Sequence, residues 1–332
     1  MKRVRHTPFI VALSTLCLIL SLSALALAKE EYPTGPITFL VGWSAGGSVD
    51  VTARTLAEVV KKELGQPVVV VNKPGMASSI TLTHLAHQKP DGYTIGLVAA
   101  SNVIVNPLLE KIEYTPDDFT YIRGCGYMVH CLGVNPKSPW KTFKEFVEYA
   151  KKNPKKVKYG SYSPISTTSF LMRLIAKAEG IDWEHIPFKG DAAATMATIG
   201  GHTDAATTAN TIFPYVRSGQ IRLLVVFNEN RSPEFPDVPT TRELGYDLPA
   251  LSDMGTFFMI LAPKGLKGAP LEKLSSAFSK AVQDPSYAKI MKELGQPILN
   301  TDFKETNRRM TDYRQKLEKI YPDLLKEVQE KQ

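Results

Sequence analysis

Residues 43–50, Trp-Ser-Ala-Gly-Gly-Ser-Val-Asp, combine the residue types that could bind an anion without a basic side chain. They stand between an apolar run typical of a strand and an amphipathic stretch typical of a helix. Two glycines let the backbone approach a ligand closely, and the first N–H groups of a helix have no partner within it and point outward at the positive end of its dipole. We therefore predict an anion site here. Its candidate residues are Trp43, Ser44, Ala45, Gly46, Gly47 and Ser48.

The side chains at the helix start have simpler roles as well. Ser48 either caps the helix or donates its hydroxyl to a ligand oxygen. We expect Asp50 to serve the first helical turn as a carboxylate and not to act as a catalytic acid.

The same segment also matches a nucleophile elbow, because residues 42–46 read G-x-S-x-G between a strand and a helix. A serine hydrolase with Ser44 as nucleophile is therefore an alternative. Against it, the elbow follows the first strand after the N-terminal apolar segment, which leaves nothing upstream to build an oxyanion loop. No downstream histidine stands in a context that marks it as the base. We expect no catalytic residue.

A second cluster of small polar residues, at 160–169, also leads from a strand into a helix. Such hydroxyls commonly only cap helices. If the cluster faced the first loop across a crevice, it would complete a second anion cradle, rimmed by residues 188–191 and 200–204, because ligands of open α/β sheets lie beyond the carboxyl ends of the strands. Candidates in this cluster are Ser163, Ser166 and Thr167.

Other chemistries lack sequence support. His84 and His87 do not have the HExxH spacing of a metal helix, and no GxGxxG, Walker or CxxC motif is present. We expect no metal, no cofactor and, from the mild positive charge, no nucleic-acid partner.

Strands and helices alternate along the chain in the manner of parallel sheets covered on both faces. We predict strands at 37–43, 68–71, 93–99, 157–160, 221–227 and 256–261. We predict helices at 49–64, 141–152, 166–179, 193–199, 271–282, 286–294 and 303–329, and a further helix that follows the turn at 72–75 and ends at about residue 88.

The N-terminus is typical of a secretory signal peptide: Lys2, Arg3 and Arg5 precede an uncharged apolar stretch at 9–27, and an Ala-x-Ala site ends at Ala28. An uncleaved membrane anchor is the alternative. A lipid anchor is disfavoured, because Leu and not a small residue precedes Cys17. Removing 28 of the 332 residues and three of the seven net positive charges leaves 304 residues with a net charge of +4.

Two cysteines lie beyond this segment, Cys125 and Cys131. On one extended strand, six steps of about 3.3 Å would place them beyond disulfide reach, whereas a hairpin around Gly126 would not. We expect two buried free thiols.

In this order, the motifs resemble the extracytoplasmic receptors of the tripartite tricarboxylate transporter family, also called Bug receptors, over essentially the whole mature chain. The resemblance rests on the segments 36–37, 45–50, 65–75, 90–94, 187–190, 200–204, 231–240 and 243–245.

The resemblance implies an α/β fold of two Rossmann-like lobes hinged like a Venus flytrap, a periplasmic-binding-protein architecture, with lobe 1 at 29–128 and 253–332 and lobe 2 at 129–252. It implies a periplasmic, monomeric receptor that binds a small carboxylate through amides, hydroxyls and waters and passes it to the integral membrane subunits of a transporter. A sensor that presents the acid to a signalling partner is the alternative.

By position, the resemblance adds Ser101, Asn102, Lys189 and Asp204 to the candidate ligand-binding residues. The chain departs from the family pattern in two places. Ser and Thr replace a Gly-rich run and a His near Ser169, and Ser78-Ser79 replaces a Gly-rich stretch after Pro74-Gly75. The fold is little affected by these departures, but they put the identity of the ligand in doubt.

Overall fold

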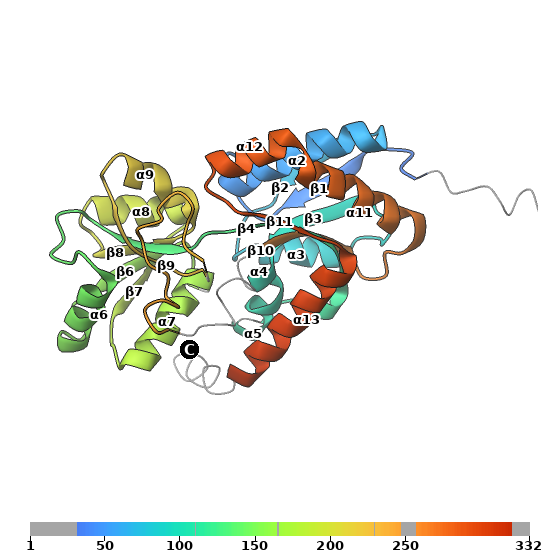
Figure 1. Ribbon diagram of the computed structural model, residues 1–332. Helices are drawn as coiled ribbons and strands as arrows, with labels where there is room; N and C mark the ends of the chain where they lie inside the picture. Colours follow the sequence, from blue (N-terminus) through green and yellow to red (C-terminus); the bar gives the residue numbers. More distant parts are fainter. Residues whose placement is uncertain (1–31, 110, 165, 229, 247–256, 321–332) are drawn as a thin grey trace, which may run out of the picture.

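The computed structural model describes residues 32–109, 111–164, 166–228, 230–246 and 257–320. Two α/β lobes lie side by side (Figure 1), each built on its own sheet, as the sequence predicted. The predicted signal peptide, the lobe boundary at 252/253 and the predicted helix beyond Ile320 fall outside the described residues. Within these residues, no helix is both long and apolar enough to cross a membrane.

The large lobe contains a six-stranded sheet of order β11-β4-β10-β3-β1-β2. Strands β1, β2 and β3 are parallel, whereas β10 runs antiparallel to β3 and β4, and β11 runs antiparallel to β4. Its elements are β1 (Ile37–Val41), α2 (Ser48–Leu64), β2 (Val68–Asn72), α3 (Ser79–Ala86), β3 (Thr94–Ala99), α4 (Ala100–Ile104), α5 (Asn106–Leu109), η1 (Pro116–Asp118), β4 (Phe119–Tyr127), β10 (Phe257–Pro263), α11 (Gly268–Gln283), α12 (Pro285–Glu293), β11 (Ile298–Thr301) and α13 (Phe303–Ile320).

The small lobe contains a five-stranded sheet of order β7-β6-β8-β5-β9, in which β6, β7 and β8 are parallel and β5 runs antiparallel to its neighbours β8 and β9. Each sheet thus has an antiparallel strand in its interior. The elements are β5 (Cys131–Val134), α6 (Phe143–Lys152), β6 (Lys158–Ser161), α7 (Thr167–Glu179), β7 (Glu184–Pro187), α8 (Asp191–Ile199), β8 (Ala205–Thr208), η2 (Asn210–Ile212), α9 (Phe213–Arg217) and β9 (Arg222–Val226).

Apolar residues on both faces of the strands explain why helices cover both sides of the large sheet. Phe39 and Val41 pack in one core with residues of α2, α11 and α12, and the intervening Leu40 belongs to the core that contains residues of α3, α4 and α13. This alternation follows from the two-residue period of a strand. Gly65 ends α2 in the left-handed conformation at φ 67°, as its position after the helix predicted.

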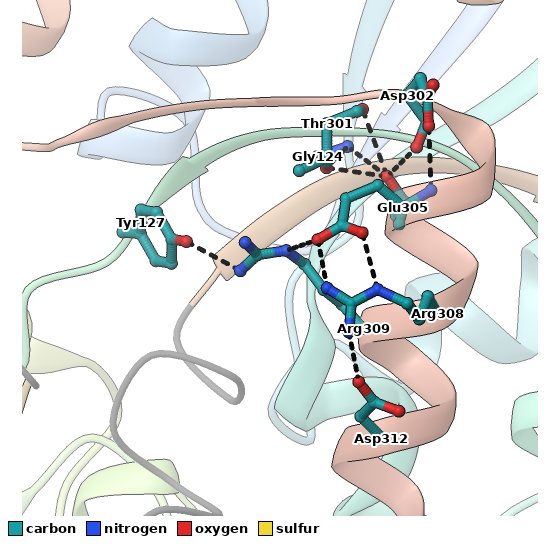
Figure 2. Close-up of polar contacts among 9 residues, drawn as sticks. Gly124, Tyr127, Thr301, Asp302, Glu305, Arg308, Arg309 and Asp312 are labelled. Atoms are coloured by element: carbon teal, nitrogen blue, oxygen red, sulfur yellow. Dashed lines mark hydrogen bonds and ion pairs between the residues drawn. The ribbon is translucent and has the colours of Figure 1, made fainter.

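Helix α13 is fastened to the last part of β4, from which the chain passes into the small lobe (Figure 2). Arg309 donates from Nη1 to the Tyr127 hydroxyl at 3.0 Å and from Nε to Glu305 at 2.9 Å. The Gly124 N–H donates to Thr306 Oγ1 of α13 at 3.0 Å and to Thr301 Oγ1 of β11 at 3.2 Å. The C-terminal part of the described chain therefore supports the crossover between the lobes.

Residues 121–134 do not form one strand. They divide between β4 and β5, which belong to different sheets, and Cys125 and Cys131 are buried free thiols, which confirms that expectation. Burial raises the pKa of both thiols far above the ordinary value. The short strands β7, β8 and β11 and the short helices α4 and α5 were not predicted. Their four to five residues carry too little periodicity to be distinguished from loops.

Candidate functional site

A cavity of about 540 Å³ lies between the lobes, where the carboxyl ends of parallel strands from both sheets meet. The loops after β1 and β2 and Asn102 of α4, which directly follows β3, form its large-lobe wall, and the loops after β6 and β7 form its small-lobe wall. Its volume is within the range of small-molecule sites. The described residues that line it are Gly42, Trp43, Ser44, Pro74, Gly75, Met76, Ala77, Ser78, Asn102, Tyr162, Ser163, Pro164, Phe188, Lys189 and Gly190.

Five of the predicted ligand-binding residues line this inter-lobe cavity, although they come from three separate loops and from helix α4. They are Trp43, Ser44, Asn102, Ser163 and Lys189. Trp43 is half-buried and packs against two core clusters, one within the large lobe and one that contains residues of both lobes, so its indole is held in place. Asn102 is buried and accepts a hydrogen bond from the Ala99 N–H at 3.3 Å through Oδ1, which orients its amide group.

Hydrogen-bond donors dominate the polar part of the lining. Among the described residues, no hydrogen bond uses Asn102 Nδ2, Trp43 Nε1, the Ser44 hydroxyl or Lys189 Nζ. Lys189 is exposed and has no carboxylate partner in the described chain. No Asp or Glu is present among the described lining residues. A group that accepts hydrogen bonds and bears negative charge is the chemical complement of such a lining.

The predicted backbone cradle at residues 45–48 must be corrected. Two of its amides are already occupied within the loop: the Gly46 N–H donates to Asp50 Oδ2 at 2.9 Å, and the Gly47 N–H donates to the Ser44 carbonyl at 3.3 Å. Ala45 and Gly46 are exposed, and Gly47 is the N-cap of α2. The cavity opens onto the N-terminal end of this segment, at Trp43 and Ser44, and not onto Ala45, Gly46, Gly47 or Ser48.

Asp50 serves the loop and the first turn of α2 through its carboxylate. Its carboxylate is buried and accepts hydrogen bonds from the Gly46 N–H, from Arg54 Nε at 3.0 Å and from Asn72 Nδ2 at 2.9 Å. Burial opposes ionisation, but the hydrogen bonds from Arg54, Gly46 and Asn72 outweigh it and hold the pKa below its ordinary value. Asp50 therefore stays ionised and fixes the turn before α2.

Three further candidates do not line the cavity: two form a hydrogen bond between the lobes, and one caps a helix. Thr167 Oγ1 donates to Ser101 Oγ at 2.9 Å, so these two buried hydroxyls bond one another across the lobes. Ser166 caps α7, where its hydroxyl accepts from the Ser169 N–H at 3.0 Å. The general tendency of hydroxyls to cap helices therefore applies to Ser166.

The prediction for Asp204 is wrong in position. Its carboxylate accepts a hydrogen bond from the N–H of Lys158 at 2.8 Å, at the beginning of β6. The cavity lies beyond the other end of this strand, after Ser161. Asp204 closes the turn into β8 on the side of the sheet away from the site.

Sequence reasoning missed the residues of the loop after β2. Pro74, Gly75, Met76, Ala77 and Ser78 all line the cavity. The signal was available, because this loop follows a parallel strand next to β1 and so had to reach the same edge of the sheet. Its residues were passed over because they are mostly apolar.

The serine hydrolase alternative is not supported by the arrangement of side chains around Ser44. No hydrogen bond joins Ser44 to a histidine in the described part of the chain. His185 bonds Ser161 Oγ at 2.7 Å, and burial lowers the pKa of both His185 and His130 to about 4. No three His, Cys, Asp or Glu side chains among the described residues cluster as metal ligands.

Comparisons with known proteins agree with this architecture. The model of the tripartite tricarboxylate transporter family receptor matches residues 52–324. The UPF0065 protein of the gbd 5' region of Cupriavidus necator is 37% identical over 278 residues, which cover 83% of this chain and 84% of that protein. The structure of the periplasmic binding protein BugD has a TM-score of 0.75 at 28% identity and covers 87% of this chain and 98% of its own.

A further solved structure, MatC from Rhodopseudomonas palustris with bound malate, has a TM-score of 0.74 at 25% identity over 86% of this chain and 99% of its own. The family and these structures represent solute-binding receptors and not enzymes. The chain belongs to the receptor family of the tripartite tricarboxylate transporters and is a periplasmic solute-binding protein.

Proposed function

We propose that this receptor captures a small organic carboxylate in the inter-lobe cavity and delivers it to the integral membrane subunits of a tripartite tricarboxylate-type transporter. The observation that carries the proposal is the lining itself: Asn102 Nδ2, Lys189 Nζ and the Ser44 hydroxyl are uncommitted donors, and no acidic side chain stands among the described lining residues. The bound malate of the similar MatC supports the choice of a carboxylate.

The ligand would be gripped by both lobes at once. Asn102 and Ser44 belong to the large lobe and Lys189 to the small lobe, so an acid bound to all three favours the closed arrangement. Each charge-assisted hydrogen bond contributes about 1.5–3 kcal/mol. Three of them sum to about 4.5–9 kcal/mol before the cost of ordering the ligand is subtracted, so contacts with the rest of the ligand must supply part of the roughly 8 kcal/mol that micromolar affinity requires.

Two uncharged-ligand controls make the binding test specific. A thermal-shift and calorimetric screen of the purified protein against small carboxylates should identify acids that raise the melting temperature, because a ligand of the native state stabilises it. The corresponding amides and alcohols should have no effect. If no carboxylate raised the melting temperature or gave binding heat, the proposal would be wrong.

We also propose that the chain reaches the periplasm by cleavage after Ala28, and that the lobes divide at 128/129 and 252/253. The mass of the intact periplasmic protein tests the first point, since cleavage there leaves Lys29 as the new N-terminus. Delivery to membrane subunits predicts that the ligand-loaded receptor co-purifies with a transporter and not with a signalling protein.

A further inference from the structure

The apolar part of the inter-lobe cavity points to the class of acid that fits it. Trp43 and Met76 line it from the large lobe, and Phe188 and Pro164 line it from the small lobe. Lys189 is the only charged side chain among the described lining residues. We infer that the ligand is a monocarboxylate with an apolar body of aromatic-ring size, and not a compact polycarboxylate; this inference rests on the proposed function.

The small lobe fixes the position of the Phe188 ring through packing and backbone hydrogen bonds. A Cβ at Gly160 would lie 3.0 Å from Phe188 Cε2, so the ring occupies the space that the absent side chain leaves. The Phe188 N–H donates to the Ser161 carbonyl at 2.8 Å, and the Gly190 N–H donates to the Tyr162 carbonyl at 3.3 Å. These bonds fix the loop after β7 on the end of β6, and Phe188 is one of the residues that line the cavity.

The large lobe presents Met76 by means of a strained turn. Met76, Ala77 and Ser78 have φ values of 45°, 48° and 69°, three successive residues in the left-handed region that favours glycine. Asn106 Nδ2 donates to the Ala77 carbonyl at 2.8 Å, and Ser78 Oγ donates to the Gly42 carbonyl at 3.0 Å, which holds the turn in place. Strain retained in this way concentrates at functional sites.

Met76 is 55% exposed, which is unusual for a large apolar side chain that lines a cavity. An apolar ligand body would cover it and remove this surface from water, the contact that favours such binding. A thioether adapts its shape to rings and branched chains alike. A second carboxylate placed in this region would lose its hydration against Trp43, Met76 and Phe188 without a basic partner.

Calorimetric titration of the protein purified from the periplasm with phenylacetate and with malate tests the inference. Phenylacetate is expected to bind at least tenfold more tightly than malate, and phenylacetamide, which has the same body without the charge, should not bind. Met76→Ala and Phe188→Ala should each reduce the affinity for phenylacetate about tenfold and should lower the ratio of phenylacetate affinity to malate affinity. Met196→Ala, which removes an exposed methionine outside the cavity lining, is the matched control.

The ratio of the two affinities within one variant does not depend on how much of the sample is folded, so a destabilised variant still gives a result. If malate bound as tightly as phenylacetate, or if Met76→Ala and Phe188→Ala left the ratio unchanged, the inference would be overturned while the proposed carboxylate function stood. If neither acid bound, and no other carboxylate did, both would fall.

Discussion

The hydroxyls of Thr167 and Ser101 lie 2.9 Å apart and form a buried hydrogen bond between the two lobes. Elsewhere between the lobes, Asn210 Nδ2 of the small lobe donates to the Leu294 carbonyl of the large lobe. The two lobes of this structure are therefore bonded to one another, and Ser101 is the chain neighbour of the lining residue Asn102. Because closure and ligand binding favour the same arrangement, the strength of these bonds should affect affinity.

Ser101→Ala removes the acceptor of Thr167 without altering any lining residue. A hydrogen bond contributes about 1 kcal/mol net, so the closed form should become about 1 kcal/mol less stable relative to the open form. The ligand should then bind roughly fivefold more weakly. Calorimetric titration with the best acid from the screen measures the change. Thr198→Ala, which breaks a buried hydroxyl pair with Thr203 inside the small lobe, should lower the melting temperature but not the affinity. Equal affinities for Ser101→Ala and the native protein would contradict the role of this bond.

Lys189→Met keeps the apolar stem of the side chain and removes its charge. Because Lys189 is exposed, screening by solvent limits the loss to about 1 kcal/mol, or roughly fivefold in affinity. The salt dependence of binding should weaken at the same time. Lys158→Met is the matched control, since Lys158 lies at the opposite end of β6 and pairs with Glu184. An unchanged salt dependence in Lys189→Met would show that this ammonium group does not attract the ligand.

Asp191 should make the protein less stable as the pH rises. Burial raises the pKa of its carboxyl to about 6, while Thr211 Oγ1 donates to Oδ2 at 3.1 Å and Oδ1 has no hydrogen bond. Since the folded pKa is above the unfolded value, the folded state binds the proton more tightly. This contribution to stability is complete below about pH 4 and is lost as the pH rises towards and through 6.

Asp191→Asn should therefore stabilise the protein at pH 7 by about 3 kcal/mol, and by almost nothing near pH 3.5. Urea unfolding of both proteins across this range gives the difference directly. Asp237→Asn, a change at an exposed aspartate, should give no comparable pH-dependent difference. If Asp191→Asn differed from the native protein by the same amount at every pH, the carboxyl would not be buried as the structure places it.

Gly42 and Ser78 fit together too closely for a side chain at residue 42. A Cβ there would lie within 2.4 Å of Ser78 Cβ, and nearer still to its Oγ. Gly42→Ala should destabilise the protein by about 1–3 kcal/mol and weaken ligand binding, because the turn at 76–78 must move. The double variant Gly42→Ala with Ser78→Gly should recover most of both losses. If adding Ser78→Gly did not restore binding, the close contact between residues 42 and 78 would not be the reason for the loss of affinity.

Much of the fold followed from the sequence because long elements carry strong periodicity. Helix α2 begins and ends within one residue of its predicted bounds, with Gly65 as its stop. The division of residues 121–134 between two sheets was not predictable, since nothing in the local pattern marks where a strand leaves one sheet for another. That choice depends on pairing with β10 and β9, which are distant in sequence.

The site was predicted in part for a similar reason. Sequence position identifies which loops reach the carboxyl edge of a sheet, and Trp43, Ser44 and Lys189 do line the cavity at that edge. It does not reveal which donors the protein uses itself. The Gly46 N–H donates to Asp50, and the Thr167 hydroxyl donates to the Ser101 hydroxyl. These candidate groups therefore form hydrogen bonds within the protein itself.

A crystal structure with the best-binding carboxylate tests the central claim most directly. The account predicts electron density for the acid between the lobes, with a carboxylate oxygen within hydrogen-bond distance of Asn102 Nδ2 and the Lys189 ammonium group on its small-lobe side. An acid bound to the amides of residues 45–48 with Asn102 Nδ2 uncontacted, or bound outside the inter-lobe cavity, would contradict it.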